Sequence, residues 1–358
     1  MLSQDHPALA IDQILDEKGI ADPARVPRVP PAEWVKMYQG MVRIRVMDER
    51  FMALQRQGRI GFYGEARGQE AAVIGTAAAL GHEDWLVPAL REAGAALYRG
   101  LPMRTFVAQL FGNANDVTLG HQMPCHPGTR AVRYVTMSSC VANQLPQAAG
   151  LAWAAKIKKD SVVAMGYMGD GATSAEDFHV ALNFSGVLRL PVVWICQNNQ
   201  WAISSPSTVQ TASPSFAIKA LAYGFEGVRV DGNDLLAIHA AARAAVDRAR
   251  AGGGPTLIEA VTYRVGAHTS SDDPSRYRDE RITEAWKAKD PIARFRNWLL
   301  QQGFIDVASD ERLRADLDAE VRSAIAEEEQ VGPPPNHSLI EHVYAEVPRT
   351  LEHQLRGE

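Results

Sequence analysis

The fold is decided by residues 161–199, which have the sequence SVVAMGYMGDGATSAEDFHVALNFSGVLRLPVVWICQNN. Apolar runs at 161–168 and 191–196 flank a stretch, 175–187, whose apolar residues recur at helical spacing. Strands that are apolar along their whole length are typical of a parallel sheet covered by helices on both faces. The segment therefore predicts a strand, helix, strand unit of an α/β fold.

The alternation of strands and helices continues toward the C-terminus. Further strands are predicted at 227–230 and 256–263, with a helix at 235–250 between them. Apolar side chains every three or four positions predict one long amphipathic helix at 31–57. Other helices are predicted at 68–80, 92–99, 103–111, 283–302 and 309–330.

We expect five segments along the chain. Four prolines in residues 1–30 predict an N-terminal arm that wraps over a neighbour or is loosely held. One large α/β domain is expected over 31–345, and within it a polar, turn-rich loop at 266–281 and charged C-terminal helices at 283–330. A tail, 346–358, follows.

Composition excludes several classes of protein. The 358 residues are 46% hydrophobic and 22% charged, with a net charge of −5, which argues against disorder and gives no reason to expect nucleic acid. Cys125, Cys140 and Cys196 are too few and too scattered for a disulfide framework or a zinc cluster. The N-terminus has no basic segment before an apolar stretch, so we expect no export and a reducing, cytoplasmic location.

An uncharged run of 22 residues, Tyr134 to Ala155, is long enough to raise the question of a membrane span. Polar residues inside it, including Ser138 and Asn143, favour a buried loop that leads into a helix. Bound ligands or ions are one way to satisfy such polar groups, and we expect no membrane partner.

Gly169-Asp170-Gly171 follows the strand at 161–168, and Asn198-Asn199 follows the next strand. The carboxyl ends of neighbouring parallel strands meet at one edge of a sheet, so Asp170, Asn199 and the carbonyl of Trp201 can converge on Mg²⁺. We expect a helix to start after Gly171, where its free backbone N–H groups can bind a diphosphate. Each motif alone is a common turn or loop signal, but their joint spacing favours a site.

The two motifs together resemble the thiamine diphosphate motif. From about residue 35 to 345 the chain is similar to the α subunits of the E1 component of 2-oxo acid dehydrogenase complexes. The segments that carry this resemblance are 90–94 (LREAG), 120–128 (GHQMPCHPG), 138–148 (SSCVANQLPQA), 230–234 (VDGND) and the loop around His268. Gln122-Met123-Pro124 and Asp272-Asp273 resemble the branched-chain enzymes more than the pyruvate or acetoin dehydrogenases.

The resemblance implies a set of cofactor contacts. Mg²⁺ would be held by Asp170, Asn199 and the Trp201 carbonyl, and the diphosphate by the N–H groups of Gly171 and Ala172. Arg91 would pair with the diphosphate, although an arginine exposed on a helix is the structural alternative. Further contacts with the cofactor would come from Ser139 and Val141, which would face the aminopyrimidine, and from Gln197 and His268.

The resemblance also implies that His268 is the catalytic histidine and that residues 266–281 form the active-site loop. Residues that would order this loop and receive the lipoyl domain are Arg264, Asp272, Tyr277 and Arg278. A K⁺ site would be formed by Ser138, the Cys140 carbonyl, Asn143 and Gln144. Satisfied polar groups of the core and ordinary loop hydrogen bonding are the alternatives for these two sets.

Two positions depart from the family pattern. Leu90 stands where a tyrosine usually contacts the diphosphate, and Gln197 stands where branched-chain enzymes tend to have an arginine. Loss of two contacts would weaken cofactor binding by about an order of magnitude. The Mg²⁺ ligands are intact, so we expect binding to persist.

The resemblance finally implies the activity and the partners. The chain would oxidatively decarboxylate 3-methyl-2-oxobutanoate and related small 2-oxo acids, within an α₂β₂ assembly whose β subunit supplies a further carboxylate. The acyl group would pass to the lipoyl domain of an E2 acyltransferase core. The α subunit of pyruvate or acetoin dehydrogenase and a non-catalytic paralogue remain as alternatives.

Overall fold

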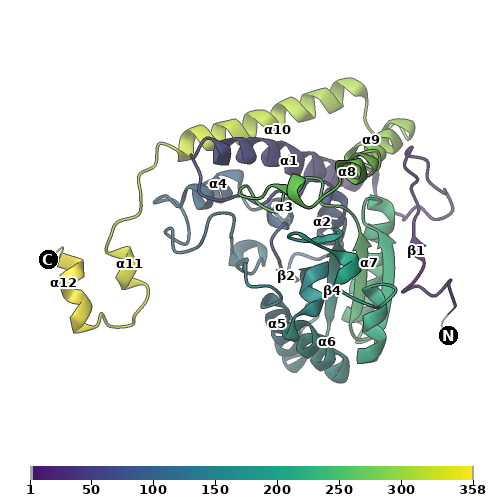
Figure 1. The fold of residues 1–358 in the computed structure, drawn as a ribbon, viewed down its shortest axis with the longest axis horizontal. Helices are drawn as coiled ribbons and strands as arrows, with labels where there is room; N and C mark the ends of the chain where they lie inside the picture. Colours follow the sequence, from purple (N-terminus) through teal and green to yellow (C-terminus); the bar gives the residue numbers. More distant parts are fainter. Residues whose placement is uncertain (1–2, 357–358) are drawn as a thin grey trace.

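A parallel sheet forms the centre of the computed structural model, which describes residues 3–356 (Figure 1). Within this described range the sheet has six strands in the order β1-β7-β8-β4-β3-β2, and all neighbouring strands are parallel. The strands are β1 (Ile11–Asp12), β2 (Trp85–Val87), β3 (Ala164–Gly169), β4 (Val192–Asn198), β7 (Glu226–Asp231) and β8 (Thr256–Val261). The predicted α/β class is confirmed.

Helices cover both faces of this sheet. The larger helices are α1 (Pro31–Arg56), α2 (Glu70–Ala77), α3 (Ala93–Tyr98), α4 (Met103–Phe111), α5 (Gln144–Lys158), α6 (Glu176–Leu188), α7 (Leu235–Arg250), α9 (Pro291–Gln301) and α10 (Val307–Glu328). Met165 and Ile195 point into a core with α1, α2 and α7, whereas Met168 and Trp194 point into a second core with α5 and α6. Strands buried on both faces explain the continuous apolar runs of the sequence.

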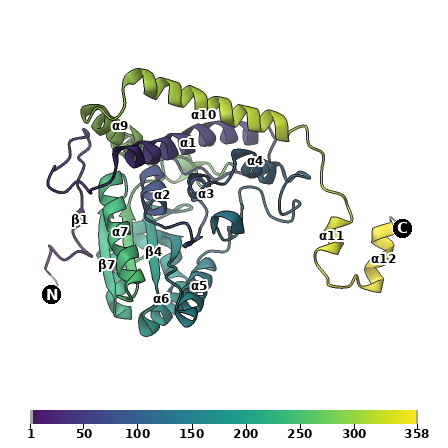
Figure 2. The same cartoon turned by 180° about the vertical axis from the view of Figure 1, so that it is seen from behind.

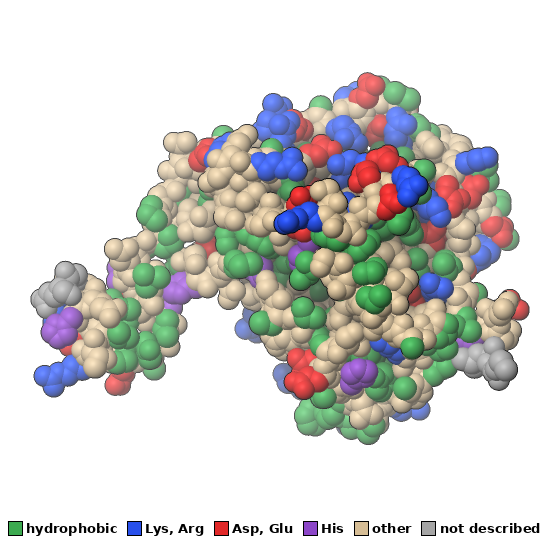
Figure 3. All heavy atoms as spheres, in the orientation of Figure 1, with side chains coloured by type: hydrophobic (Ala, Val, Ile, Leu, Met, Phe, Trp, Pro, Cys, Tyr) green, Lys and Arg blue, Asp and Glu red, His purple; other side chains and the backbone are tan. Residues whose placement is uncertain are grey.

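Long helix α1 lies beside α10, as both ribbon views show (Figures 1 and 2). The side chains that predicted this helix at spacings of three and four, among them Trp34, Met41 and Phe51, are all buried. Charged side chains gather on the outer surface over α10 (Figure 3). After α10 the chain leaves the body of the molecule and carries α11 (Ser338–Glu341) and α12 (Glu352–Arg356) (Figure 1).

The N-terminal arm packs against its own chain. β1 pairs with β7, and Leu15 is completely buried. The Asp234 carboxylate accepts hydrogen bonds from the N–H groups of Ile14 and Leu15, both at 2.6 Å. The described part of the arm is therefore not loosely held. Residues 1–2 of the expected arm and 357–358 of the expected tail lie outside the described residues.

The helix predicted at 283–302 is two helices, α8 (Glu280–Lys287) and α9. They separate at Asp290, whose side chain caps α9 by accepting from the N–H groups of Ile292 and Ala293 at 2.9 and 3.0 Å. Pro291 occupies the first turn of α9, where its missing N–H is harmless. The prediction was wrong because the apolar spacing continues across this cap.

The uncharged run forms a loop that leads into α5, as predicted, but the loop is not fully buried. Ser139, Cys140 and Val141 are exposed. Polar side chains of the run such as Ser139 and Gln147 are therefore accessible to solvent, whereas Gln144 is buried. In the part of the chain that the structure describes, we find no helix of the length and apolarity that crossing a bilayer requires.

Replacing Asp234 by alanine is expected to lower the free energy of unfolding by about 2–4 kcal/mol, because four N–H groups lose their acceptor. Two of these groups belong to the arm and two to the first turn of α7. Chemical denaturation measures the change. Asp247→Ala, an exposed change on the same helix, is the control, and an equal effect of both variants would contradict the assignment.

Candidate functional site

A cavity of about 400 Å³ opens where β3 and β4 end. It is lined by all the residues to which the sequence assigned cofactor or Mg²⁺ contacts: Arg91, Ser139, Val141, Asp170, Gly171, Ala172, Gln197, Asn199, Trp201 and His268. Ser138, Cys140 and Gln144 line it as well, whereas Asn143 does not. The predicted loop residues, by contrast, do not line this cavity: Arg264, Asp272, Tyr277 and Arg278.

Asp170 and Asn199 meet because β3 and β4 pair with Gly169 opposite Gln197. The Asp170 carboxylate is 1% exposed and accepts from Gln210 Nε2 at 2.7 Å and from the Asn199 N–H. Both donors are uncharged, and burial raises the pKa of Asp170 to about 6. A buried carboxylate of this kind is compensated when a cation binds beside it.

The donor set suits Mg²⁺. Within residues 3–356 no cluster of three or more His, Cys, Asp or Glu side chains could hold a metal. A cation here must therefore use amide and backbone oxygens in addition to Asp170, which Mg²⁺ accepts when water and phosphate complete its coordination. Asn199 Nδ2 donates to Gln69 Oε1 at 3.0 Å, and Oδ1 accepts from the Trp201 N–H at 3.2 Å. The amide is thus held in one orientation, and the second lone pair of Oδ1 can still face a cation.

Gly171 permits a close approach between two segments of the site. A Cβ at this position would lie 2.5 Å from Cβ of Ala202, in the short strand β5 (Trp201–Ala202). The chain after β3 forms a 3₁₀ turn at Asp170–Ser174, and α6 begins only at Glu176. The expected helix start directly after Gly171 is thus replaced by this turn.

His268 and Arg91 lie against each other at the cavity wall. Arg91 Nη2 donates to the His268 carbonyl at 3.0 Å and lies 3.3 Å from Nδ1 of the ring. Burial, followed by the positive charges of Arg91 and Arg264, lowers the pKa of His268 to about 4. The imidazole is therefore neutral at physiological pH, and acceptance at Nδ1 assigns its proton to Nε2.

The loop at 266–281 is ordered by the residues that the sequence singled out. Asp272 Oδ2 accepts from the His268 N–H at 2.7 Å and from the Tyr277 hydroxyl at 2.5 Å. Arg264 Nη2 donates to the Tyr277 hydroxyl at 2.7 Å. Arg278 donates to three backbone carbonyls at the start of the loop. These contacts, all within residues 264–278, fix the position of the His268 backbone.

The residues of the expected K⁺ site are mostly bonded to one another. Ser138 Oγ accepts from Asn143 Nδ2 at 3.2 Å, and the Cys140 carbonyl accepts from the Asn143 N–H at 3.3 Å. Gln144 Nε2 donates to the Tyr167 carbonyl at 2.7 Å. In the described part of the chain, Gln144 Oε1 is a buried oxygen without a hydrogen-bond partner. That oxygen is the feature of the set that still calls for a cation or a water molecule.

Several polar residues of the site were not among those predicted from the sequence. Gln197 donates to Glu92, which is 1% exposed and whose pKa burial raises to about 7. Glu92 lies in the LREAG segment beside Arg91, and the segment itself was the only signal for it. Ser139 Oγ is bonded to the ring of His126, in the GHQMPCHPG segment. Gln210, which contacts Asp170, belongs to a loop without any motif.

The site and the fold together define the class of protein. The model of the family described as "Dehydrogenase E1 component" matches residues 38–336, so the chain belongs to this family. Membership implies thiamine diphosphate as the cofactor, and a β subunit and an E2 component as partners.

Relatives of known name agree with this membership. The chain is 41% identical over 344 residues to the mitochondrial 2-oxoisovalerate dehydrogenase subunit alpha 2 of Arabidopsis thaliana, an alignment that covers 96% of this chain and 73% of the relative. It is 39% identical over 348 residues to the mitochondrial alpha subunit of Homo sapiens, covering 97% and 78% of the two chains. It is also 39% identical over 355 residues to the mitochondrial 2-oxoisovalerate dehydrogenase alpha subunit of Caenorhabditis elegans. That alignment covers 98% of this chain and 82% of the relative.

The expected cytoplasmic location is contradicted by these relatives, which are named as mitochondrial subunits. The expectation rested on free cysteines and on the missing secretory signal. Free thiols are typical of any reducing compartment, so they could not distinguish the cytoplasm from the mitochondrial interior.

Replacing Arg91 by glutamine is expected to raise the pKa of His268 by about one unit, because one of the two nearby positive charges is removed while burial remains. The pH dependence of modification of His268 by diethyl pyrocarbonate, measured by peptide mass spectrometry on cofactor-free protein, reports this pKa. Arg67→Gln, at an exposed arginine, is the control. An unchanged profile in the Arg91 variant would show that this contact does not govern the histidine.

Proposed function

We propose that this chain is the α subunit of a thiamine diphosphate-dependent branched-chain 2-oxo acid dehydrogenase E1. It oxidatively decarboxylates 3-methyl-2-oxobutanoate and related 2-oxo acids and passes the acyl group to the lipoyl group of E2. The observation that carries the proposal is the convergence of Arg91, Asp170, Asn199 and His268 on one cavity. The sequence identity to 2-oxoisovalerate dehydrogenase α subunits supports the substrate class.

The cavity residues fit thiamine diphosphate with Mg²⁺. When bound, the cofactor supplies the electron sink for decarboxylation. Asp170, Asn199 and the Trp201 carbonyl hold Mg²⁺, and the buried, uncompensated carboxylate supports this assignment. The N–H groups of Gly171 and Ala172 bind the diphosphate.

The remaining contacts orient the cofactor. Arg91 pairs with the diphosphate and is itself fixed by the His268 carbonyl. Ser139 and Val141, on the exposed loop before α5, face the aminopyrimidine. The unpartnered Gln144 Oε1 supports a K⁺ ion bound with Ser138, Cys140 and Asn143 beside that loop.

His268 is the catalytic histidine of the proposed reaction. Its neutral ring carries the proton on Nε2, from which it donates a hydrogen bond to the lipoyl group during reductive acylation. Arg264, Asp272, Tyr277 and Arg278 order the loop that receives the lipoyl domain.

The site requires a β subunit in an α₂β₂ assembly. The acidic residues that line the cavity are Asp170, which is assigned to the metal, and Glu92, which is bonded to Gln197. This supports the family pattern, in which the β subunit supplies the carboxylate that activates the cofactor's pyrimidine. Exposed apolar side chains on α5 and α6, including Trp153 and Val180, support a subunit contact there. Within this assembly, residues 31–345 act as one cofactor-binding domain, which the N-terminal arm (1–30) precedes and the tail (346–358) follows.

Reconstitution of the α chain with its β subunit tests the substrate. Decarboxylation measured side by side with an artificial electron acceptor is expected to give a higher kcat/KM for 3-methyl-2-oxobutanoate than for pyruvate, by about tenfold or more. A preference for pyruvate would instead identify a pyruvate dehydrogenase α subunit.

Gln197→Arg is expected to tighten thiamine diphosphate binding about tenfold, because a guanidinium can pair with Glu92 and with the diphosphate at once. Fluorescence titration of the α₂β₂ protein with the cofactor and Mg²⁺ measures the Kd. Gln302→Arg, at an exposed position distant from the site, is the control. Absence of saturable binding to the parent protein would overturn the enzyme proposal in favour of a non-catalytic paralogue.

A further inference from the structure

We propose that Glu65 is a positioning residue that fixes His268 and Arg91 relative to each other. It lies in the connection between α1 and α2, outside every motif that identified the site. The inference rests on the proposed role of His268 in transfer to the lipoyl group. It concerns the geometry of the chain before cofactor binds, so it can be tested separately from that role.

Glu65 contacts both partners through different groups. Its backbone carbonyl accepts a hydrogen bond from Arg91 Nη1. Its carboxylate accepts from the N–H of Ala267, the residue directly before His268. Because Arg91 Nη2 in turn donates to the His268 carbonyl at 3.0 Å, the three segments form a closed ring of hydrogen bonds.

The active-site loop has room for this carboxylate because residue 266 is glycine. A Cβ built on Gly266 would overlap the Glu65 carboxyl group, and the three atoms nearest to it all belong to Glu65. The carboxyl group therefore occupies the place that a side chain at 266 would take. A methyl group at 266 would displace the carboxylate from the Ala267 N–H.

Two carboxylates hold two successive N–H groups of the loop. Glu65 holds Ala267, and Asp272 Oδ2 holds His268 at 2.7 Å. Asp272 belongs to the loop itself, whereas Glu65 belongs to the body of the protein. Glu65 thus ties the start of the loop to the body, and Tyr63 ties it again at Ser270, with its carbonyl 3.1 Å from the Ser270 N–H and its N–H 3.3 Å from Ser270 Oγ.

The backbone around Glu65 is itself rigidly held. Asp48 of α1 is 2% exposed, and its carboxylate accepts from the Tyr63 hydroxyl at 2.7 Å and from the Ala66 N–H at 2.9 Å. Glu65 stands between these two attachment points. A residue in a fixed backbone can hold a neighbouring loop in a defined position.

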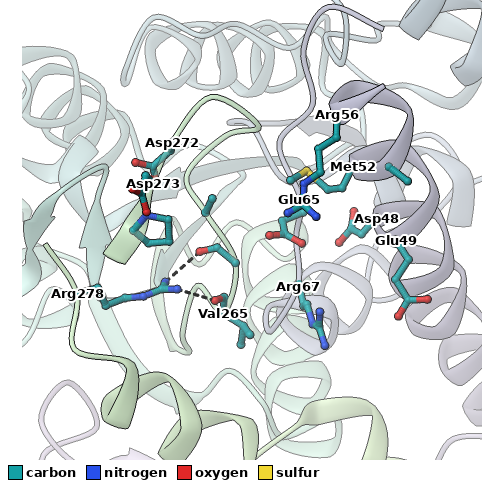
Figure 4. A pocket seen from close by; sticks show the side chains of 14 residues that line it. Asp48, Glu49, Met52, Arg56, Glu65, Arg67, Val265, Asp272, Asp273 and Arg278 are labelled. Atoms are coloured by element: carbon teal, nitrogen blue, oxygen red, sulfur yellow. Dashed lines mark hydrogen bonds between the residues drawn. The ribbon is translucent and has the colours of Figure 1, made fainter. Parts of the chain in front are cut away.

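A second cavity, of about 640 Å³, lies behind the loop and exposes one side of Glu65 (Figure 4). Asp48, Glu49, Arg67, Asp273 and Arg278 are among its lining residues. Because this space is empty, no packed side chain lies there to support residues 265–267 in place of the Glu65 carboxylate. If the Glu65 carboxylate is removed, packing of other side chains therefore does not replace its contact with the loop.

The test compares Glu65→Ala, Glu65→Gln and Gly266→Ala in the α₂β₂ protein, with Glu49→Ala as the matched control. Glu49 is an exposed acid that lines the same cavity, so its removal changes charge there equally. Hydrogen exchange of the cofactor-free protein, followed in peptides that cover residues 266–270, is the first readout. It reports the loop without any catalysis.

Glu65→Ala and Gly266→Ala are each expected to speed exchange of the Ala267 amide about tenfold, because both remove the same hydrogen bond. The double variant should exchange no faster than either single one, since the bond can be lost only once. Glu65→Gln, whose amide oxygen still accepts, should stay within about threefold of the parent. Glu49→Ala should leave this exchange unchanged.

The second readout separates the two half-reactions. Glu65→Ala is expected to lower kcat/KM for acylation of the lipoyl domain about tenfold while decarboxylation with an artificial acceptor falls less than about threefold. Unchanged exchange at Ala267 in Glu65→Ala would overturn the proposal, and so would equal losses in both half-reactions. An inactive parent protein would instead refute the proposed function, because the exchange result is independent of turnover.

Discussion

The pairing of β3 with β4 is the constraint on which the site depends. Its parallel register places Gly169 opposite Gln197, so both strands end at one edge of the sheet and Asp170 comes within hydrogen-bonding reach of the Asn199 N–H. The close approach of β5 over Gly171 then closes the site from the side. Because the sheet is buried on both faces, neither strand can slip without exposing core residues to water.

Buried charge is the second organising principle. Asp170, Glu92 and Arg264 are almost completely buried. Burial raises the pKa of the two carboxyl groups and lowers that of the arginine, which in each case favours the neutral form. Such groups weaken the free fold unless a ligand compensates them. The cavity is therefore suited to a ligand that brings a cation for Asp170 and an anion for Arg91, which lines the cavity as well. A diphosphate with a bound metal ion has this character.

Much of the fold could be predicted from periodicity, and much of the cavity from two motifs. Helix α1 followed from its apolar spacing, whereas the break before Pro291 was hidden because the same spacing continues across it. β1 was missed because two residues carry no pattern, and its place depends on pairing with β7. Glu65 and Gln210 were missed for a similar reason: each acts from a loop on a residue far away in the sequence.

The sequence by itself determined the class of fold, the family and the residue types that can bind a metal diphosphate, because these depend on local periodicity and on short motifs. Only the tertiary structure decided which groups hold one another: Glu92 with Gln197, Arg91 with His268, and Glu65 with the loop at Ala267. Those pairs join segments separated by about a hundred residues or more, and their distances are set by the packing of the sheet and helices. Hydrogen bonds depend on such distances within a few tenths of an ångström, and spacing along a chain does not encode them.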